Sequence, residues 1–209
     1  YRCWKKRGHG AMNLHDALVQ SCDVYFYTLG HRLGIDNLAK YAKKLGFGSN
    51  TGIGLSGEKS GLIPTSAWKK KVKNEVWYPG ETISASIGQG YNLITPLQNA
   101  SMISAIANGG FLPTPYLVKK IEDSEGKLIK EFSPKNLKNI AMDPEILKHL
   151  KEGLRGVVYE PHGTGHRARL KNIVVSGKTG TAQVVSMKDS EDIDPEEKIP
   201  YSFRDHAWF

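Results

Sequence analysis

Val175-Ser176-Gly177-Lys178-Thr179-Gly180-Thr181-Ala182 is the stretch that decides the fold of this chain of 209 residues. An apolar run over 173–175 leads into it and predicts a strand over 173–176 that continues through Lys-Thr-Gly to Val185. Gly177 and Gly180 have no side chains, so another backbone or a ligand can approach this strand closely. The pattern therefore predicts a strand that lines a binding site.

A second short motif, Ser21-Cys22-Asp23, lies far upstream at the end of a helix-like segment over 14–20. Penicillin-binding proteins and serine β-lactamases carry Ser-x-x-Lys, Ser-x-Asn and Lys-Thr-Gly in that order. Ser21-Cys22-Asp23 and Lys178-Thr179-Gly180 resemble the second and third of these motifs and keep the family's order. The pair is far more specific than a lone Lys-Thr-Gly, since three common residues recur by chance.

Further stretches resemble class B penicillin-binding proteins, the peptidoglycan D,D-transpeptidases. Beside the Lys-Thr-Gly-Thr-Ala-Gln run, these are Gly88-Gln89-Gly90, Thr95-Pro96-Leu97-Gln98 and Gly163-Thr164-Gly165. Within the class, segment 1–10 and the Asp at position 23 look most like the cell-elongation type, penicillin-binding protein 2; division-type relatives usually carry Asn there. The resemblance covers nearly the whole chain.

The resemblance implies a mixed α+β fold, the transpeptidase fold that penicillin-binding proteins share with serine β-lactamases, with an antiparallel sheet packed against helices. The order of the expected elements independently favours this class, because helices, a hairpin and a further helix precede the final strands. We expect residues 1–209 to form one partial transpeptidase domain, truncated at both ends, with a mobile acidic loop over 186–203.

The nucleophilic motif is missing where the resemblance requires it. Ser-x-x-Lys should precede Ser21, yet none of the first twenty residues is a serine. Later matches begin at Ser56, Ser66 and Ser124, and we interpret all three as chance. We therefore expect this chain to start after its own nucleophile and to be inactive alone.

The resemblance assigns catalytic roles to Ser21, Lys178 and Asp23. Lys178 is expected close to the Ser21 hydroxyl, where its charge lowers the cost of anionic groups and aids proton transfer to the leaving amine. Asp23 stands where the family more commonly has Asn. The two differ chemically, because an ionised carboxylate cannot donate a hydrogen bond. Asp23 is instead expected to form an ion pair with the lysine of the missing Ser-x-x-Lys motif.

The resemblance assigns substrate binding to Thr179, Gly180 and Thr181. The Thr179 hydroxyl is expected to bind the terminal carboxylate of the substrate. The backbone N–H of Thr181 is expected to be one of two donors to the developing oxyanion, and the other would come from the absent serine.

The two cysteines, Cys3 and Cys22, form with His9 a Cys-x5-His-x12-Cys pattern of three zinc-type ligands. A structural zinc site would need a fourth ligand, which could lie upstream. A Cys3–Cys22 disulfide and a buried, free Cys22 remain alternatives. We expect no catalytic cofactor.

Local signals place most helices. Helix starts are expected at Asn13, Asp36, Thr95-Pro96 and Asp143-Pro144, and a very apolar helix over 24–33 is expected to be mostly buried. A hairpin is expected around 123–126, and a strand begins at His206. The expected buried stripes are Leu97, Ala100, Ile103 and Ile106 in one helix and Ile146, Leu147, Leu150 and Leu154 in another.

Lysine and arginine number 29 against 21 acidic residues, but the lysines are scattered and no nucleic-acid motif accompanies them, so we expect no nucleic-acid partner. The expected partners are peptidoglycan stem peptides, β-lactams and other cell-wall synthesis proteins of the membrane. The expected location is the periplasmic face of the bacterial inner membrane, anchored by an N-terminal segment outside this chain. The alternatives are a β-lactamase or β-lactam sensor of the same fold and, from another class, a non-catalytic basic binding module.

Overall fold

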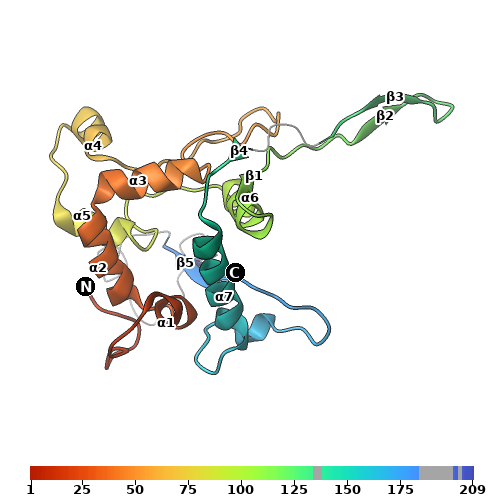
Figure 1. Ribbon diagram of the computed structural model, residues 1–209. Helices are drawn as coiled ribbons and strands as arrows, with labels where there is room; N and C mark the ends of the chain where they lie inside the picture. The colour runs from red at the N-terminus through yellow and green to blue at the C-terminus, as the bar shows by residue number, and fades with distance from the viewer. Residues whose placement is uncertain (134–137, 184–199, 202–203) are drawn as a thin grey trace.

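The computed structural model describes residues 1–133, 138–183, 200–201 and 204–209 (Figure 1). The elements in chain order are α1 (Leu14–Val19), α2 (Asp23–Leu33), α3 (Ile35–Lys44), α4 (Ser66–Lys73), α5 (Pro79–Ala85), α6 (Pro96–Ala107), β1 (Phe111–Leu112), β2 (Lys120–Glu122), β3 (Leu128–Glu131), β4 (Lys138–Asn139), α7 (Pro144–Tyr159), a 3-10 turn (His166–Ala168), β5 (Gly180–Ala182) and β6 (His206–Trp208). The loop predicted over 186–203 lies outside the described residues, except for Pro200 and Tyr201. In the part described, no helix is long and apolar enough to cross a membrane.

Local capping chemistry starts three helices where the sequence predicts. The Asn13 side chain accepts from the Asp16 N–H at 2.8 Å and opens α1. Thr95 and Gln98 form a reciprocal capping box at α6, with bonds of 3.0 and 3.2 Å. Asp143 caps α7 through the Glu145 N–H at 2.8 Å. These bonds join residues two or three positions apart, so a short window of sequence determines them.

The predicted cap at Asp36 is wrong. Gly34 precedes α3, and the Asp36 carboxylate lies in the first turn, where it accepts from the Ser66 N–H at 3.0 Å and the Ser66 hydroxyl at 2.6 Å. Asp36 therefore connects α3 to the start of α4. The Asp36 carboxylate thus accepts from an N–H group 30 residues away rather than from one in its own helix.

Burial of the helix faces also differs from the prediction. On α6 the side of Gln98, Ser101 and Ala105 is buried, whereas Ile103 is 44% exposed. Gln98 donates from Nε2 to the carbonyls of Ser49 and Ser60 at 2.7 and 2.8 Å, so the loop over 46–63 satisfies a buried amide. On α7, Ile146 is exposed while Leu147 and Leu154 are buried. The apolar residues at 25–27 in α2 are only half-buried.

The strands form three separate antiparallel pairs, β1–β4, β2–β3 and β5–β6, within the described residues. The hairpin β2–β3 forms as predicted and projects away from the rest of the described chain (Figure 1). The strand predicted over 173–185 is much shorter, because only Gly180–Ala182 pair with His206–Trp208 and residues 173–179 are irregular. Val185 itself lies outside the described residues.

The core consists of two apolar clusters that meet at Met102 of α6. Met102 packs against a cluster of Ala39, Phe47 and Ile63 and against a second one of Ile106, Leu147 and Leu154. Helices α1 and α7 approach closely because two glycines of α7 face α1: a Cβ at Gly156 would lie 2.6 Å from Val19 Cγ2, and one at Gly153 would lie 2.9 Å from Leu18 Cδ1. This close approach positions the end of α1, where Ser21 lies.

Candidate active site

Ser21 lies just beyond α1, in a backbone conformation that residues other than glycine rarely adopt. Its φ is +52°, in the left-handed region, whereas most residues with positive φ in this chain are glycines. The Ser21 N–H donates to the Leu18 carbonyl at 3.3 Å, and the Cys22 N–H donates to the Ala17 carbonyl at 2.9 Å. These two hydrogen bonds close a tight turn after α1, and α2 begins directly after it at Asp23.

The Lys178 ammonium donates to the Ser21 hydroxyl at 2.8 Å, across 157 residues of sequence. The segment before Lys178 is held against α7, because the Gly177 N–H donates to the Leu154 carbonyl at 3.1 Å. Phe209 covers Gly177 so closely that an added Cβ would lie 2.5 Å from the ring. The predicted proximity of Lys178 to Ser21 is present, and α7 supports both.

Burial perturbs the Lys178 side chain. Loss of hydration lowers the pKa of Lys178 below that of an ordinary lysine, and the negative charge of Asp23 opposes this effect. A second hydrogen bond, to the Thr179 carbonyl at 2.9 Å, orients the ammonium. A half-buried lysine with a lowered pKa, next to a serine hydroxyl in a cleft, is suited to moving protons.

A cleft of about 650 Å³ surrounds this pair. The predicted residues Ser21, Asp23, Lys178, Thr179, Gly180 and Thr181 all line it, together with Trp4, Leu18, Phe26, Ser86, Ile87, Gln89 and Thr164. The Thr179 hydroxyl lies 2.7 Å from the Thr164 hydroxyl. The sequence motifs contain Thr164 and Gln89, but nothing local indicates that they face the cleft.

Strand β5 presents one edge to the cleft. The Gln89 amide donates to the Thr181 carbonyl at 2.7 Å, which marks the cleft side of the strand. In a regular strand the N–H and C=O of one residue point to the same side. The Thr181 N–H is therefore expected to face the cleft as well, the orientation that a donor to an oxyanion needs.

Asp23 accepts from the Trp4 backbone N–H at 3.2 Å. No lysine forms an ion pair with it in the parts of the chain that the structure describes, so the predicted lysine partner stays a prediction.

The three chance matches to Ser-x-x-Lys do not contribute to the cleft lining. Ser66 bonds to Asp36, Ser124 lies in the turn of the β2–β3 hairpin, and Ser56 is exposed in the glycine-rich loop.

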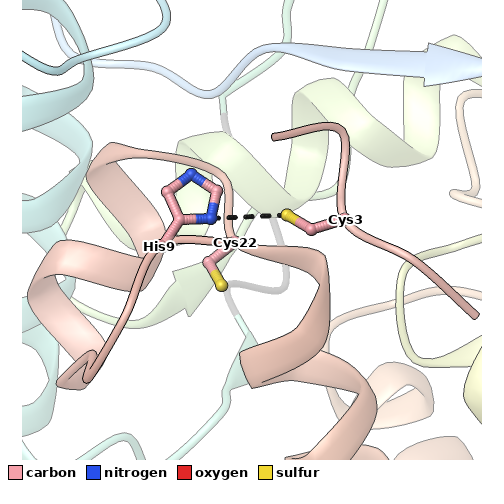
Figure 2. Close-up of side chains that lie close together, drawn as sticks. All are labelled: Cys3, His9 and Cys22. Carbon is pink, nitrogen blue, oxygen red and sulfur yellow. Dashed lines mark hydrogen bonds between the residues drawn. The ribbon is translucent and has the colours of Figure 1, made fainter. Parts of the chain in front are cut away.

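Cys3, His9 and Cys22 gather beside the Ser21 turn (Figure 2). One ligand atom from each lies within 4.8 Å of the other two, and Cys3 Sγ lies 3.4 Å from His9 Nδ1. Both cysteines are free thiols, so the structure contains no Cys3–Cys22 disulfide. The other ring nitrogen, His9 Nε2, is buried without a hydrogen-bond partner among the described residues.

The protonation of this trio follows from its burial. Desolvation lowers the pKa of His9, assisted by Lys5 and opposed by Asp23, and so favours the neutral imidazole. Burial raises the pKa of the Cys22 thiol, against hydrogen bonds from backbone N–H groups. A neutral imidazole and two cysteines, which lose their protons when they bind zinc, are a donor set that suits this metal.

Comparison with known proteins places the whole chain in one family. Residues 1–209 match the penicillin binding protein transpeptidase domain. Peptidoglycan D,D-transpeptidase MrdA of Haemophilus influenzae is 39% identical over 212 residues, which is 100% of this chain and 32% of that protein. Stage V sporulation protein D of Bacillus subtilis is 40% identical over 185 residues, 88% of this chain and 27% of that protein.

Solved structures agree with the fold. Penicillin-binding protein 2 of Helicobacter pylori, solved in complex with MreC, matches with a TM-score of 0.79 at 36% identity over 100% of this chain and 35% of that one. Penicillin-binding protein 2 of Pseudomonas aeruginosa, in complex with WCK 5153, matches with a TM-score of 0.77 at 38% identity over 88% of this chain and 41% of that one. The chain spans about a third of the length of the curated relatives it matches. This chain belongs to the penicillin-binding protein transpeptidase family.

Proposed function

We propose that this chain is part of a type 2, class B penicillin-binding protein, a peptidoglycan D,D-transpeptidase that is also acylated by β-lactams. The observation that carries the proposal is the 2.8 Å hydrogen bond from Lys178 to Ser21 in a cleft also lined by Thr179 and Thr181. A serine hydroxyl paired with a desolvated lysine is an arrangement that transfers protons during acyl transfer.

The reaction has two steps, acylation of the enzyme and transfer of the acyl group to an amine. The nucleophilic serine, from a Ser-x-x-Lys upstream of these residues, forms an ester with the carbonyl between the two terminal D-alanines of a stem peptide. The C–N bond breaks, and the terminal D-alanine leaves as an amine that has taken up a proton through Ser21 and Lys178. An amine of a neighbouring stem then attacks the ester and forms the cross-link, the ester C–O bond breaks, and the proton that this amine loses passes to the serine oxygen.

Binding of the donor stem is assigned to the strand side of the cleft. The Thr179 hydroxyl donates to the terminal carboxylate, and its 2.7 Å contact with Thr164 restricts its rotation. Lys178 supplies a positive charge near the same carboxylate. Gly180 leaves space for the substrate backbone, and the Thr181 N–H donates to the oxyanion. Asp23 is assigned an ion pair with the lysine of the upstream motif.

Partners and location follow from the same proposal. The Helicobacter pylori relative was solved with MreC, and another relative belongs to a peptidoglycan synthase complex. We infer that the protein containing this chain assembles with cell-wall synthesis proteins and acts at the periplasmic face of the inner membrane, held by a segment N-terminal to these residues. Below, "full-length protein" means the protein of the relatives' length that contains this chain.

The first prediction is that the full-length protein binds fluorescent penicillin covalently and releases it slowly. A transpeptidase excludes water from its acyl-enzyme, so the adduct is expected to persist for hours, whereas a β-lactamase releases it within seconds. Gel fluorescence after a chase with unlabelled penicillin measures both steps. Rapid loss of the label would favour a β-lactamase, and no label at all would favour a non-catalytic basic module.

We also propose a structural zinc ion held by Cys3, His9 and Cys22, with a fourth ligand outside these residues. Zn–S bonds near 2.3 Å place the ligands of a tetrahedral site roughly 3.5–4 Å apart, so ligand atoms within 4.8 Å need only small shifts. The zinc would have no catalytic role. It would hold the N-terminal loop to Cys22 and thereby the backbone between Ser21 and Asp23.

The second prediction concerns this metal. Chelation of the full-length protein is expected to lower its melting temperature by several degrees and to slow acylation, and Cys22→Ser is expected to reproduce both effects. Differential scanning calorimetry and elemental analysis of protein prepared without added zinc provide the measurements. Cys22→Ser also serves as the control, because chelator should not destabilise it further. A preparation without zinc whose stability responds to reductant and not to chelator would refute the proposal in favour of a disulfide.

A further inference from the structure

Trp4 connects the N-terminal loop to the turn that carries Ser21. Its indole Nε1–H donates to two carbonyls, Gln20 at 3.1 Å and Ser21 at 3.0 Å. Its backbone N–H donates to the Asp23 carboxylate at 3.2 Å. One residue therefore contacts every residue from 20 to 23 except Cys22.

Trp4 also contacts His9, one member of the Cys3, His9 and Cys22 group. The indole lies edge-on to the His9 imidazole, with ring centroids 5.4 Å apart at 69°. Cys3 is its chain neighbour, and Cys22 follows Ser21. The position of the indole is thus determined on both sides, by the His9 ring and by the turn after α1.

The Ser21 turn needs such a support. Carbonyls at a helix C-terminus have no partner within the helix, so groups outside the helix must satisfy them. Ser21 also has a φ of +52°, a conformation that is unfavourable for a residue other than glycine. A donor to the Gln20 and Ser21 carbonyls stabilises this reversal against relaxation, and relaxation would rotate the Ser21 hydroxyl away from Lys178.

We infer that Trp4 is a positioning residue, whose indole N–H holds the Ser21 turn in the conformation that receives the Lys178 hydrogen bond. The catalytic part of this inference rests on the proposed function, whereas the conformational part does not. Trp4 acts through Ser21 and need not touch the substrate.

The exposure of Trp4 raises one competing role. The residue is 60% exposed and lines the cleft, so the ring could instead form part of the substrate-binding surface. The two roles differ in what they change. A positioning residue alters the rate of acylation within the complex, whereas a binding residue alters the affinity of the complex.

The third prediction uses Trp4→Phe in the full-length protein, which keeps an aromatic ring beside His9 but loses the indole N–H together with part of the ring system, the same loss that the control variant below makes. The acylation rate constant at saturating penicillin is expected to fall about tenfold, because the reacting groups are misplaced, while the dissociation constant of the non-covalent complex stays unchanged. Stopped-flow acylation over a range of penicillin concentrations separates the two constants. The matched control is Trp77→Phe, since the Trp77 indole N–H also donates a hydrogen bond, to the Thr82 hydroxyl at 2.8 Å, outside the cleft lining.

Hydrogen–deuterium exchange supplies a readout that does not depend on activity. In Trp4→Phe, amide exchange over residues 20–23 is expected to rise severalfold, with no rise there in Trp77→Phe. Equal acylation rates and equal exchange in Trp4→Phe and wild type would overturn the inference. A change in the dissociation constant alone would assign Trp4 to substrate binding instead. Should wild type take up no penicillin while exchange behaves as expected, the proposed function fails and the conformational role of Trp4 stands.

Discussion

Lys178→Ala in the full-length protein is expected to slow β-lactam acylation by a factor of about 10² to 10³, the loss that follows removal of one charged or polar group from a pre-organised site. The ammonium lies 2.8 Å from the Ser21 hydroxyl and is half-buried in the cleft, so no water molecule replaces it at equal cost. Stability is expected to change much less, because burial of this charge is itself unfavourable and its removal relieves that cost. Acylation kinetics and thermal melting of the same preparation measure the two effects.

Lys178→Arg is the control for this variant, because it keeps the positive charge but cannot release a proton at moderately alkaline pH. Burial lowers the pKa of Lys178, so acylation by wild type is expected to decline on the alkaline side at a pH below the ordinary lysine value of 10.5. If the charge is what matters, Lys178→Arg retains partial activity and loses this alkaline decline. Acylation of Lys178→Ala within a few-fold of wild type would contradict the role given to Lys178.

The 209 residues expressed on their own are expected to form no covalent adduct with penicillin. The cleft contains Ser21 and Lys178, but the family's nucleophile belongs to a Ser-x-x-Lys that these residues do not supply upstream of Ser21. Intact-mass spectrometry after incubation with labelled penicillin tests this directly. The full-length protein is the positive control, and circular dichroism shows whether the shorter chain is folded.

The later Ser-x-x-Lys matches are not expected to substitute for the nucleophile. In the best placed of them, at the start of α4, the Ser66 hydroxyl donates to Asp36 at 2.6 Å. Burial alone would lower the pKa of Lys69, but its hydrogen bonds to Glu81 and Glu75 raise it, so this lysine is not a base. An adduct mapped by peptide sequencing to Ser66, Ser56, Ser124 or Ser21 would show that this interpretation of the motifs is wrong.

What the sequence by itself determined was local in origin. The caps at Asn13, Thr95 and Asp143 and the turn at 123–126 depend on hydrogen bonds between residues a few positions apart, and the structure has each of them. The family also came from the sequence, since Ser21-Cys22-Asp23 and Lys178-Thr179-Gly180, together with the family-like stretches between them, indicated it by their order, and the family match over 1–209 confirmed it.

Only the tertiary structure decided which of these residues meet. The Lys178–Ser21 hydrogen bond joins residues 157 positions apart. It forms because α7 contacts both partners: α1 packs closely against the glycines of α7, and the Gly177 N–H donates to the Leu154 carbonyl. Separations of 15 and 92 positions likewise concealed the contact of Thr164 with Thr179 and the Gln89 bond to the Thr181 carbonyl. The buried side of α6 was mispredicted in part, since Ile106 is buried as predicted but Ile103 is exposed and Gln98 is buried, where a loop far upstream supplies partners for its amide. Helix packing and long-range hydrogen bonds set these positions, and neither is encoded in the few residues around any one of them.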